Sequence, residues 1–284
     1  MDWGHPGVQM HWSNGLMTNG STPLANRSVR LRIVNKLRLG RHVLGAAAIF
    51  LGVITWVWHG FNGWQQIDAL GNGPHREILA YIVGAIEILA GLAMQTSRTA
   101  RAGAITLACI FSCFALLWIP RIIATPLVYD PWGNFFEQSS QVAGALIVYA
   151  TVGRAEADRK PRLARLAYLL FAICVISFML EQLISLSATA SFVPKWIPPG
   201  QMFWAILTTI AFALAAIALL VERQALLASR LTTAMIIGFG LLVWLPAPFA
   251  NAHQLFNWAG NGVNLAIAGA AWIVADYLDP MDAC

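Results

Sequence analysis

The stretch GRAEADRKPRLAR, residues 153–165, decides how this chain is organised. It is the only strongly charged run in the middle of an otherwise apolar sequence, and it carries five basic side chains: Arg154, Arg159, Lys160, Arg162 and Arg165. Pro161 prevents a helix from running smoothly through it. Hydrophobic sequence of roughly equal length lies on each side and divides into four helix-sized segments. We therefore predict a cytoplasmic hinge at residues 154–162 between two four-helix halves.

The composition excludes an ordinary soluble protein. Of the 284 residues, 58% are hydrophobic and only 11% are charged, whereas an average soluble protein is about 25% charged. The polar spacing at helical period that a soluble core would need is missing. The net charge of +5 comes from basic residues beside apolar segments, which is typical of topology signals and contacts with anionic lipid. We predict an all-α, polytopic membrane protein whose partner is membrane lipid and not nucleic acid.

Eight segments are long and apolar enough to cross a membrane: residues 42–60, 78–96, 103–122, 138–153, 163–185, 201–221, 231–248 and 260–278. Most are near the ~20 residues that a helix needs to span the hydrocarbon, and the fourth is the shortest. Each must be a helix, because an open strand could not satisfy its backbone hydrogen bonds in lipid. We expect residues 1–40 to form a disordered tail ending in a basic interfacial segment, and residues 279–284 a short C-terminal tail.

The distribution of basic residues predicts the orientation of the chain. With the N-terminus in the cytoplasm, fifteen of the eighteen Lys and Arg residues lie in cytoplasmic segments. The three exceptions are Arg76, Arg121 and Lys195. The opposite orientation would invert that ratio. The positive-inside rule therefore predicts a bacterial-type inner-membrane protein with both termini in the cytoplasm.

The two halves share a spacing of tryptophans and prolines at the ends of their third spans and the starts of their fourth. The matching pairs are Trp118-x-Pro120 with Trp244-x-Pro246, and Trp132 with Trp258, each fourteen residues further on. A duplication that relates residues 41–153 to residues 163–278 explains this spacing. Because each half has an even number of spans, the repeats would be parallel and related by an axis along the membrane normal.

Two carboxylates fall within or at the edge of predicted spans. Glu87 is central in the second span, where a lone carboxylate costs ~3 kcal/mol or more, so it should face the bundle and be protonated or paired. Arg121, at the outer end of the third span, is a candidate partner. Glu181 lies nearer the outer end of the fifth span. A structural hydrogen bond between helices would explain either carboxylate, whereas a functional one could relay a proton.

Depth and sidedness predict an outward-facing site in the first half, with Glu87, His59 and Arg121 as candidate catalytic residues. Glu87 would form the floor of the pocket. Arg121 could hold Glu87 ionised or bind an anionic group, and His59 could exchange protons with the outer solution. Without a ligand, the same three residues would only form polar contacts that hold neighbouring helices together, and that interpretation stays open.

The outer helix ends also carry the candidate ligand-binding residues, which are Tyr129, Trp58, Trp132 and Glu181. Tryptophans at this level would stack a flat ring. The competing interpretation is an aromatic belt that anchors the helices at the headgroup level. No zinc motif or nucleotide fingerprint is present, and no pair of histidines has the spacing of ligands that face each other across the bundle, so no metal is predicted.

The pattern Gly84-x-x-Glu87-x-x-x-Gly91 resembles the second helix of the DoxX-like family of small four-helix membrane proteins. The segment VPKWIPPG, residues 193–200, is similar to the proline-rich entry to that helix in many members, although here it lies in the second half. The resemblance covers about residues 40–278, as two copies of a unit usually found singly. In the second half, two threonines stand near where the acidic residue would lie, so an acidic site is expected in one half only.

Some members of that family are subunits of quinol oxidase or thiosulfate:quinone oxidoreductase systems. The resemblance therefore implies a redox-linked protein that binds a quinone or lipid-like molecule in an outward-facing pocket, with partners among the subunits of a membrane redox complex. Two other functions stay open: a non-catalytic scaffold or assembly subunit of a membrane complex, and a small-molecule transporter. The transporter has less support, since only one carboxylate is well buried in the predicted spans and no pair of broken helices is evident.

Overall fold

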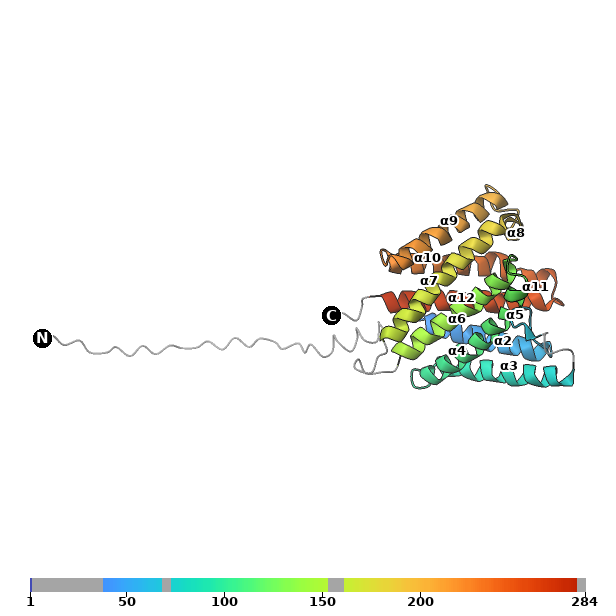
Figure 1. Cartoon of the computed structure of the whole chain (residues 1–284), viewed down its shortest axis with the longest axis horizontal. Coiled ribbons are helices and arrows are strands. Elements are labelled where there is room, and N and C mark those ends of the chain that lie inside the picture. The colour runs from blue at the N-terminus through green and yellow to red at the C-terminus, as the bar shows by residue number, and fades with distance from the viewer. Residues whose placement is uncertain (2–37, 68–72, 153–160, 280–284) are drawn as a thin grey trace, which may run out of the picture. The chain divides into compact units, whose positions relative to one another are not determined.

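The structure, a computed structural model, describes residues 38–67, 73–152 and 161–279, together with Met1. Every regular element in these ranges is a helix (Figure 1), and the helices belong to one compact unit that begins at Arg38. The predicted N-terminal tail with its interfacial segment, almost all of the hinge, and the C-terminal tail after residue 279 lie outside the described residues.

Long helices form the body of the unit and short ones follow some of them. The long helices are α2 (Gly40–Val57), α3 (Pro74–Met94), α4 (Ala100–Leu117), α6 (Asp130–Thr151), α7 (Pro161–Ile184), α9 (Gln201–Leu220), α10 (Ala225–Phe239) and α12 (Leu255–Leu278). The short ones are α5 (Ile119–Ala124), α8 (Leu186–Phe192), α11 (Ala247–Ala250) and a π-helical stretch, η3 (Gly240–Trp244), that continues α10. Pro74 and Pro161 open their helices, a position where a missing N–H leaves no helical bond unmade.

Among the described residues, seven helices are long and apolar enough to cross a membrane, counting α5 with α4 and the short stretches after α10 with α10. They cover Gly40–Val57, Pro74–Met94, Ala100–Ala124, Pro161–Ile184, Gln201–Leu220, Ala225–Ala250 and Leu255–Leu278. Each overlaps one of the predicted spans. The fourth predicted span, residues 138–153, overlaps α6, which begins earlier, ends at Thr151 and is not among the seven. The chain is an integral membrane protein with seven candidate spans.

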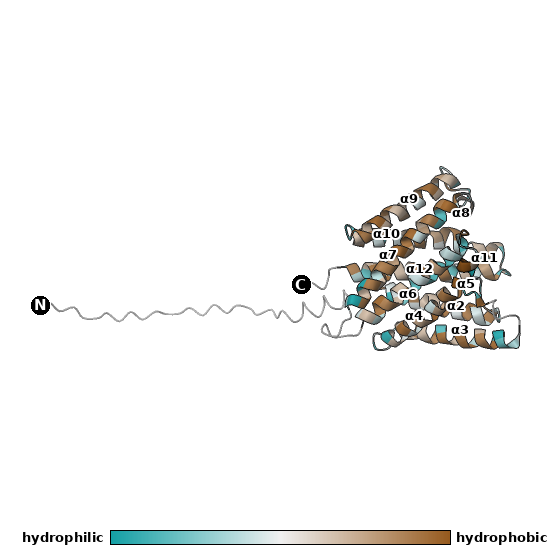
Figure 2. Cartoon of the chain, viewed as in Figure 1, coloured by the Kyte–Doolittle hydropathy of each residue, from teal (hydrophilic) through white to brown (hydrophobic). Residues whose placement is uncertain are grey.

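Apolar side chains on the outer faces of the helices agree with a lipid environment. Leu89 on α3 is 66% exposed and Leu214 on α9 is 62% exposed, and many other large aliphatic side chains are also exposed. Water would not tolerate so much apolar surface on a monomer, whereas lipid does. Figure 2 shows apolar residues along the lengths of the helices and hydrophilic residues mostly near their ends.

Glycines let α2 and α3 pack at backbone contact. A Cβ on Gly52 would lie 2.5 Å from Gly84 O, and a Cβ on Gly91 would lie 2.4 Å from Gly45 O. Membrane helices rely on this kind of close packing, because lipid removes the hydrophobic drive that brings soluble helices together. The close approach fixes the side of α3 that carries Glu87, since a Cβ on Gly52 would also lie 3.2 Å from Glu87 Cβ.

Helices α6 and α12 lie side by side at the centre of the unit. Each also packs against the first helix of the opposite half of the chain, α6 on α7 and α12 on α2. Figure 1 shows α12 running between α2 on one side and α10 on the other. α6 is enclosed by protein over most of its length, and its buried polar residues are Gln138, Ser139, Ser140 and Gln141. The neighbours of α6 thus explain why it can be less apolar than the other long helices.

Candidate functional site

A buried loop, residues 61–67, turns back into the bundle after α2 ends. Its buried residues are Phe61, Asn62, Trp64, Gln65 and Ile67. Side chains of the loop satisfy its own backbone: Asn62 N donates to Gln65 Oε1 at 3.1 Å, and Trp64 N donates to Asn62 Oδ1 at 3.0 Å. From α4, Trp118 Nε1 donates to Trp64 O at 3.0 Å. Irregular backbone among membrane helices needs this kind of cover.

The buried loop contacts Glu87 on α3. Glu87 is fully buried, and Gln65 Nε2 lies 3.5 Å from its Oε1 atom. Among the described residues, Glu87 Oε2 has no hydrogen-bond partner, and neither do the buried Thr55 Oγ1 and Gln138 Oε1 atoms. A carboxylate in such apolar surroundings is costly as an anion. The interior of the first half therefore holds one acidic group with little polar compensation.

The same loop binds a second acid. Trp64 Nε1 donates to Glu137 Oε2 at 2.7 Å, across to α6. The following residue, Gln65, is the one that contacts Glu87. Two successive residues of the buried loop thus contact acidic groups on two different helices, α6 and α3. A displacement of the loop would change the surroundings of both acids together.

A cavity of about 330 Å³ lies among α7, α8, α9, α10 and α12, and residues from α6 and the buried loop complete its wall. Six aromatic side chains of the second half line it: Phe178, Phe192, Trp204, Phe212, Phe239 and Trp244. Its polar side chains are Glu137, Glu181, Gln182, Thr189, Thr208 and Asn264. Small-molecule sites in proteins are typically ~300–1,000 Å³ and mostly apolar with a few polar groups. This cavity has that composition and the lower end of that size.

Two carboxyl groups reach the cavity from neighbouring helices. Glu137 comes from α6 and Glu181 from α7, and both side chains line the cavity; they are called the acid pair below. Glu181 rests on Gly133, where a Cβ would lie 2.8 Å from Glu181 Oε2. Beside it, Gln182 Oε1 accepts hydrogen bonds from Thr208 Oγ1 at 3.1 Å and from Thr209 Oγ1 at 3.2 Å. These contacts join α7 to α9 at the level of the acid pair.

Tyr129, just before α6, lies near this acid pair. Its hydroxyl donates to Ser177, whose carbonyl O is 3.2 Å away and whose Oγ is 3.0 Å away. Burial raises the pKa of the Tyr129 hydroxyl above its usual value, the hydrogen bond to Ser177 lowers it, and the charge of Glu181 raises it. Tyr129 is therefore a neutral hydrogen-bond donor at neutral pH and contributes no negative charge of its own.

The wall of the cavity formed by α10 ends in the aromatic side chain of Trp244. Its ring centroid lies 6.1 Å from that of Trp64, 5.6 Å from that of Phe256 and 6.3 Å from that of Phe192. The ring covers Gly260 on α12, where a Cβ would lie 2.0 Å from Trp244 Cζ3. Trp244 belongs to the π-helical stretch η3, and π-helical turns occur frequently at functional sites.

The structure does not bring the predicted catalytic residues together. Glu87 has Gln65 beside it instead of Arg121. Arg121 is exposed on α5, with its guanidinium carbon 5.6 Å from the centroid of the Trp118 ring. The suggested pairing of Arg121 with Glu87 therefore has no counterpart among the described contacts, because the two side chains occupy an exposed and a fully buried position.

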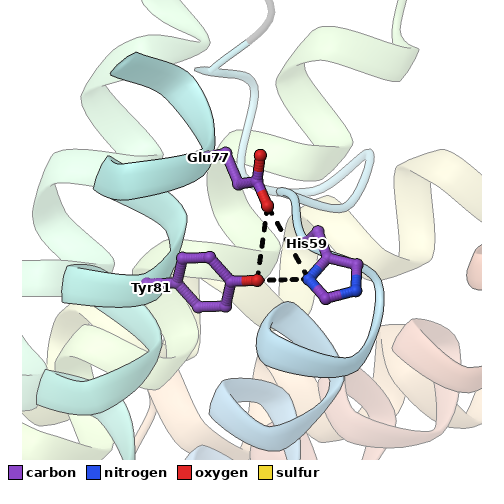
Figure 3. Close-up of polar contacts among 3 residues, drawn as sticks. All are labelled: His59, Glu77 and Tyr81. Atoms are coloured by element: carbon purple, nitrogen blue, oxygen red, sulfur yellow. Dashed lines mark hydrogen bonds and ion pairs between the residues drawn. The ribbon is translucent and has the colours of Figure 1, made fainter. Parts of the chain in front are cut away.

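His59 belongs to a separate, exposed group at the end of α2. It hydrogen-bonds through Nδ1 to the Tyr81 hydroxyl, and its Nδ1 atom lies 3.8 Å from Glu77 Oε1 (Figure 3). The Tyr81 hydroxyl also contacts Glu77 Oε1, at 3.3 Å. The side chains of His59 and Glu77 are 63% and 51% exposed. Proton exchange with solvent is open to His59, and its role in a site stays a prediction.

Of the four predicted ligand-binding residues, Glu181 lines the cavity and Tyr129 lies near it. Trp58 packs with its ring centroid 6.1 Å from that of Trp258. Trp132 Nε1 donates to Pro126 O at 3.2 Å. Neither Trp58 nor Trp132 is among the residues that line the cavity. Their positions suit helix-end anchors, the alternative interpretation of the aromatic residues.

Sequence reasoning missed Trp64, Gln65 and Glu137 as members of a site. The polar run Glu137–Gln141, EQSSQ, was a usable signal, because it stands where an apolar span was predicted. The buried loop had no comparable signal. A short segment rich in Trp and Gln after a membrane helix predicts an interfacial turn as readily as a turn into the protein.

Within the described ranges, no three His, Cys, Asp or Glu side chains come together in a way that could hold a metal ion. Comparison with known proteins finds no matching family model, no matching curated protein and no matching solved structure. The function therefore has to be argued from the geometry and chemistry of the site itself.

Proposed function

We propose that this protein binds a quinone or another lipid-like molecule in the cavity among α7, α9, α10 and α12, as part of a membrane redox system. The observation that carries the proposal is the cavity of about 330 Å³ with aromatic walls and two carboxyl groups. A flat ring suits the aromatic side chains, which prefer offset or edge-to-face contacts. The apolar remainder of the wall suits an alkyl or isoprenoid tail.

The two carboxyl groups suit a ligand with a carbonyl oxygen. Without a counterion, an acid in apolar surroundings favours its neutral form, and a neutral carboxyl group donates a hydrogen bond. Glu137 is held in place by Trp64 Nε1 at 2.7 Å, and Glu181 by its fit against Gly133. A quinone reduced in this cavity would find two acids from which to take protons. The electrons would come from a redox subunit, the class of partner that the DoxX-like resemblance implies.

We propose that α6 is an eighth span, which returns both termini to one side of the membrane. Its 22 residues are long enough to cross the hydrocarbon, and its neighbours shield its polar residues from lipid. With eight spans, the basic residues predict cytoplasmic termini and a cavity that opens on the outer side of a bacterial-type inner membrane.

Three contacts support a tandem duplication of a DoxX-like unit. α6 packs on α7 as α12 packs on α2. Trp132 Nε1 and Trp258 Nε1 each donate to the carbonyl oxygen of the residue six positions earlier, Pro126 and Ala252. A Cβ on Gly144 would lie 2.9 Å from Ala270 Cβ, and these two residues are as far apart in sequence as the two tryptophans. Equivalent residues that touch are expected where a two-fold axis passes between repeats.

Binding of a short-chain ubiquinone analogue to the purified full-length protein tests the proposal. Trp204→Leu removes an aromatic side chain from the cavity wall and should weaken binding about 3- to 10-fold, the worth of one aromatic contact. Trp196→Leu is the matched control, because Trp196 is nearby in sequence, is 74% exposed and does not line the cavity. Saturable binding with this difference supports the proposal. Equal affinities for both variants, or no saturable binding by the parent protein, would remove the cavity as the quinone site.

One observation favours a small-molecule transporter as the second candidate. The sequence predicted a single well-buried carboxylate, whereas the structure has Glu137 and Glu181 in a cavity in addition to the fully buried Glu87. Acidic groups inside a membrane protein commonly mark pathways for substrates or protons. Uptake into proteoliposomes distinguishes the candidates, since a static binding protein would take up ligand only to the stoichiometry of its sites.

A further inference from the structure

We propose that the cavity selects lipophilic organic cations: the polar end of its ligand carries one positive charge, which lies between Glu137 and Glu181. This inference rests on the cavity being the ligand site proposed above and narrows the lipid-like class to one charge type. It commits to a chemistry that a neutral quinone does not have, so the two proposals can fail separately.

The ionisable side chains that line the cavity are all acidic. Among the described residues that line it, none is Lys, Arg or His, and the two carboxyl groups are the only ionisable side chains. Lys195 lies between two wall residues in sequence but is itself exposed. The Trp64 N–H donates to Glu137 without bringing a charge. Two acids in an apolar cavity without a protein counterion leave a place for one positive charge from the ligand, because a pair of charges is far less costly there than a single one.

The aromatic residues of the same wall suit a cation as well as a ring. Tryptophan is the aromatic side chain that attracts cations most strongly, when the cation lies within about 6 Å of its ring. Trp64, Trp204 and Trp244 all line the cavity. The same surface therefore offers apolar contact to the body of a ligand and electrostatic attraction to its charged end, the combination used to bind quaternary ammonium groups.

Binding of a cation would displace a proton from the acid pair. When no ligand is bound, the acid pair keeps its charge low by holding protons; when one monovalent cation enters, one proton leaves to water, so the net charge of the cavity does not change. The titratable groups near the pair are Tyr129, just before α6, and Asp130, the first residue of α6. The walls that α9, α10 and α12 contribute carry no titratable side chain among the described residues.

Equilibrium dialysis of the purified full-length protein with tetraphenylphosphonium and with tetraphenylborate tests the inference. The two ions have the same shape and opposite charge. We expect saturable binding of the cation only, about tenfold or more weaker in Glu137→Gln and in Glu181→Gln, since each variant removes one partner of a desolvated charge pair. Glu222→Gln is the matched control, because Glu222 is an exposed carboxylate paired with Arg165 at 2.9 Å, away from the cavity.

A second measurement keeps the inference testable where a variant does not fold. The parent protein should bind the cation more weakly at mildly acidic than at mildly alkaline pH, because protons compete for the same acids. Equal binding of the two ions, or cation binding that is the same at both pH values, would overturn the inference. Saturable quinone binding without cation binding would overturn it while leaving the proposed function intact, and binding of neither would overturn both.

Discussion

Gly52→Ala should destabilise the protein, because the structure leaves no room for a methyl group between α2 and α3. A Cβ at this position would lie 2.5 Å from Gly84 O and 2.8 Å from Ile88 Cγ1. The first of these atoms belongs to the backbone and cannot rotate away. The contact is roughly 1 Å shorter than ordinary van der Waals contact, so the two helices would have to move apart by about that distance.

The expected cost follows from that separation. A gap of about 0.5–1 Å forfeits between a quarter and a half of the dispersion attraction across an interface, and overpacking of this kind costs about 1–3 kcal/mol. The better helix propensity of alanine returns up to about 1 kcal/mol. We expect the free energy of unfolding to fall by roughly 1–2 kcal/mol. Gly238→Ala is the matched control, because it makes the same change in α10 where nothing lies within 4 Å of the added Cβ.

Reversible unfolding of both purified variants in mixed micelles, followed by helical circular dichroism, measures the difference. Gly238→Ala should leave the free energy of unfolding unchanged or raise it by up to about 1 kcal/mol. The reasoning fails if Gly52→Ala is as stable as the parent protein. It also fails if both variants lose the same stability, since the loss would then reflect a general intolerance of membrane helices to alanine and not the contact with Gly84.

Three further predictions concern the site and the topology. Trp64→Phe should lower the free energy of unfolding by about 1–3 kcal/mol, because Glu137 loses its donor, whereas Trp196→Phe should have no measurable effect on the same unfolding curve. Glu87→Gln should preserve folding, since the amide is isosteric, and should leave quinone-linked turnover unchanged, because Glu87 does not line the cavity; loss of turnover would instead support the proton-relay role that the sequence predicted for Glu87. Single cysteines at positions 70, 130, 191 and 252 should react with an impermeant thiol reagent in whole cells and one at 157 should not, and the reverse labelling would invert the topology.

The sequence predicted the apolar helices well, because a long apolar segment in lipid can only be a helix. The fourth predicted span, residues 138–153, includes most of the polar run Glu137–Gln141, and the helix that holds this run, α6, begins at Asp130 and is not among the seven candidate spans. In the structure α6 packs against α4, α7, α12 and α2, so neighbouring helices lie against those polar residues. A hydropathy scale reports how readily a side chain leaves water for an apolar phase, and it does not report which helices will surround that side chain.

The candidate site was only partly predictable. Glu87 and Glu181 stood out because carboxylates are rare in apolar spans. Glu137 is also a carboxylate next to a predicted span, but its place in the site depends on Trp64 of the buried loop. Nothing in the sequence of residues 61–67 fixes the direction in which that loop turns. Arg121 and His59 were grouped with Glu87 by depth and sidedness, and neither says on which face of a helix a side chain lies or whether it is exposed.

Photo-crosslinking with an azido-benzoquinone analogue, followed by peptide mapping of the full-length protein, is the sharpest test of the cavity as the ligand site. We expect label within residues 178–212 and 236–267, and loss of that label when unmodified short-chain quinone is added in excess. Saturable label confined to α2, α3 and α4, around His59 and Glu87, would contradict the cavity as the site and favour the position in the first half that the sequence predicted.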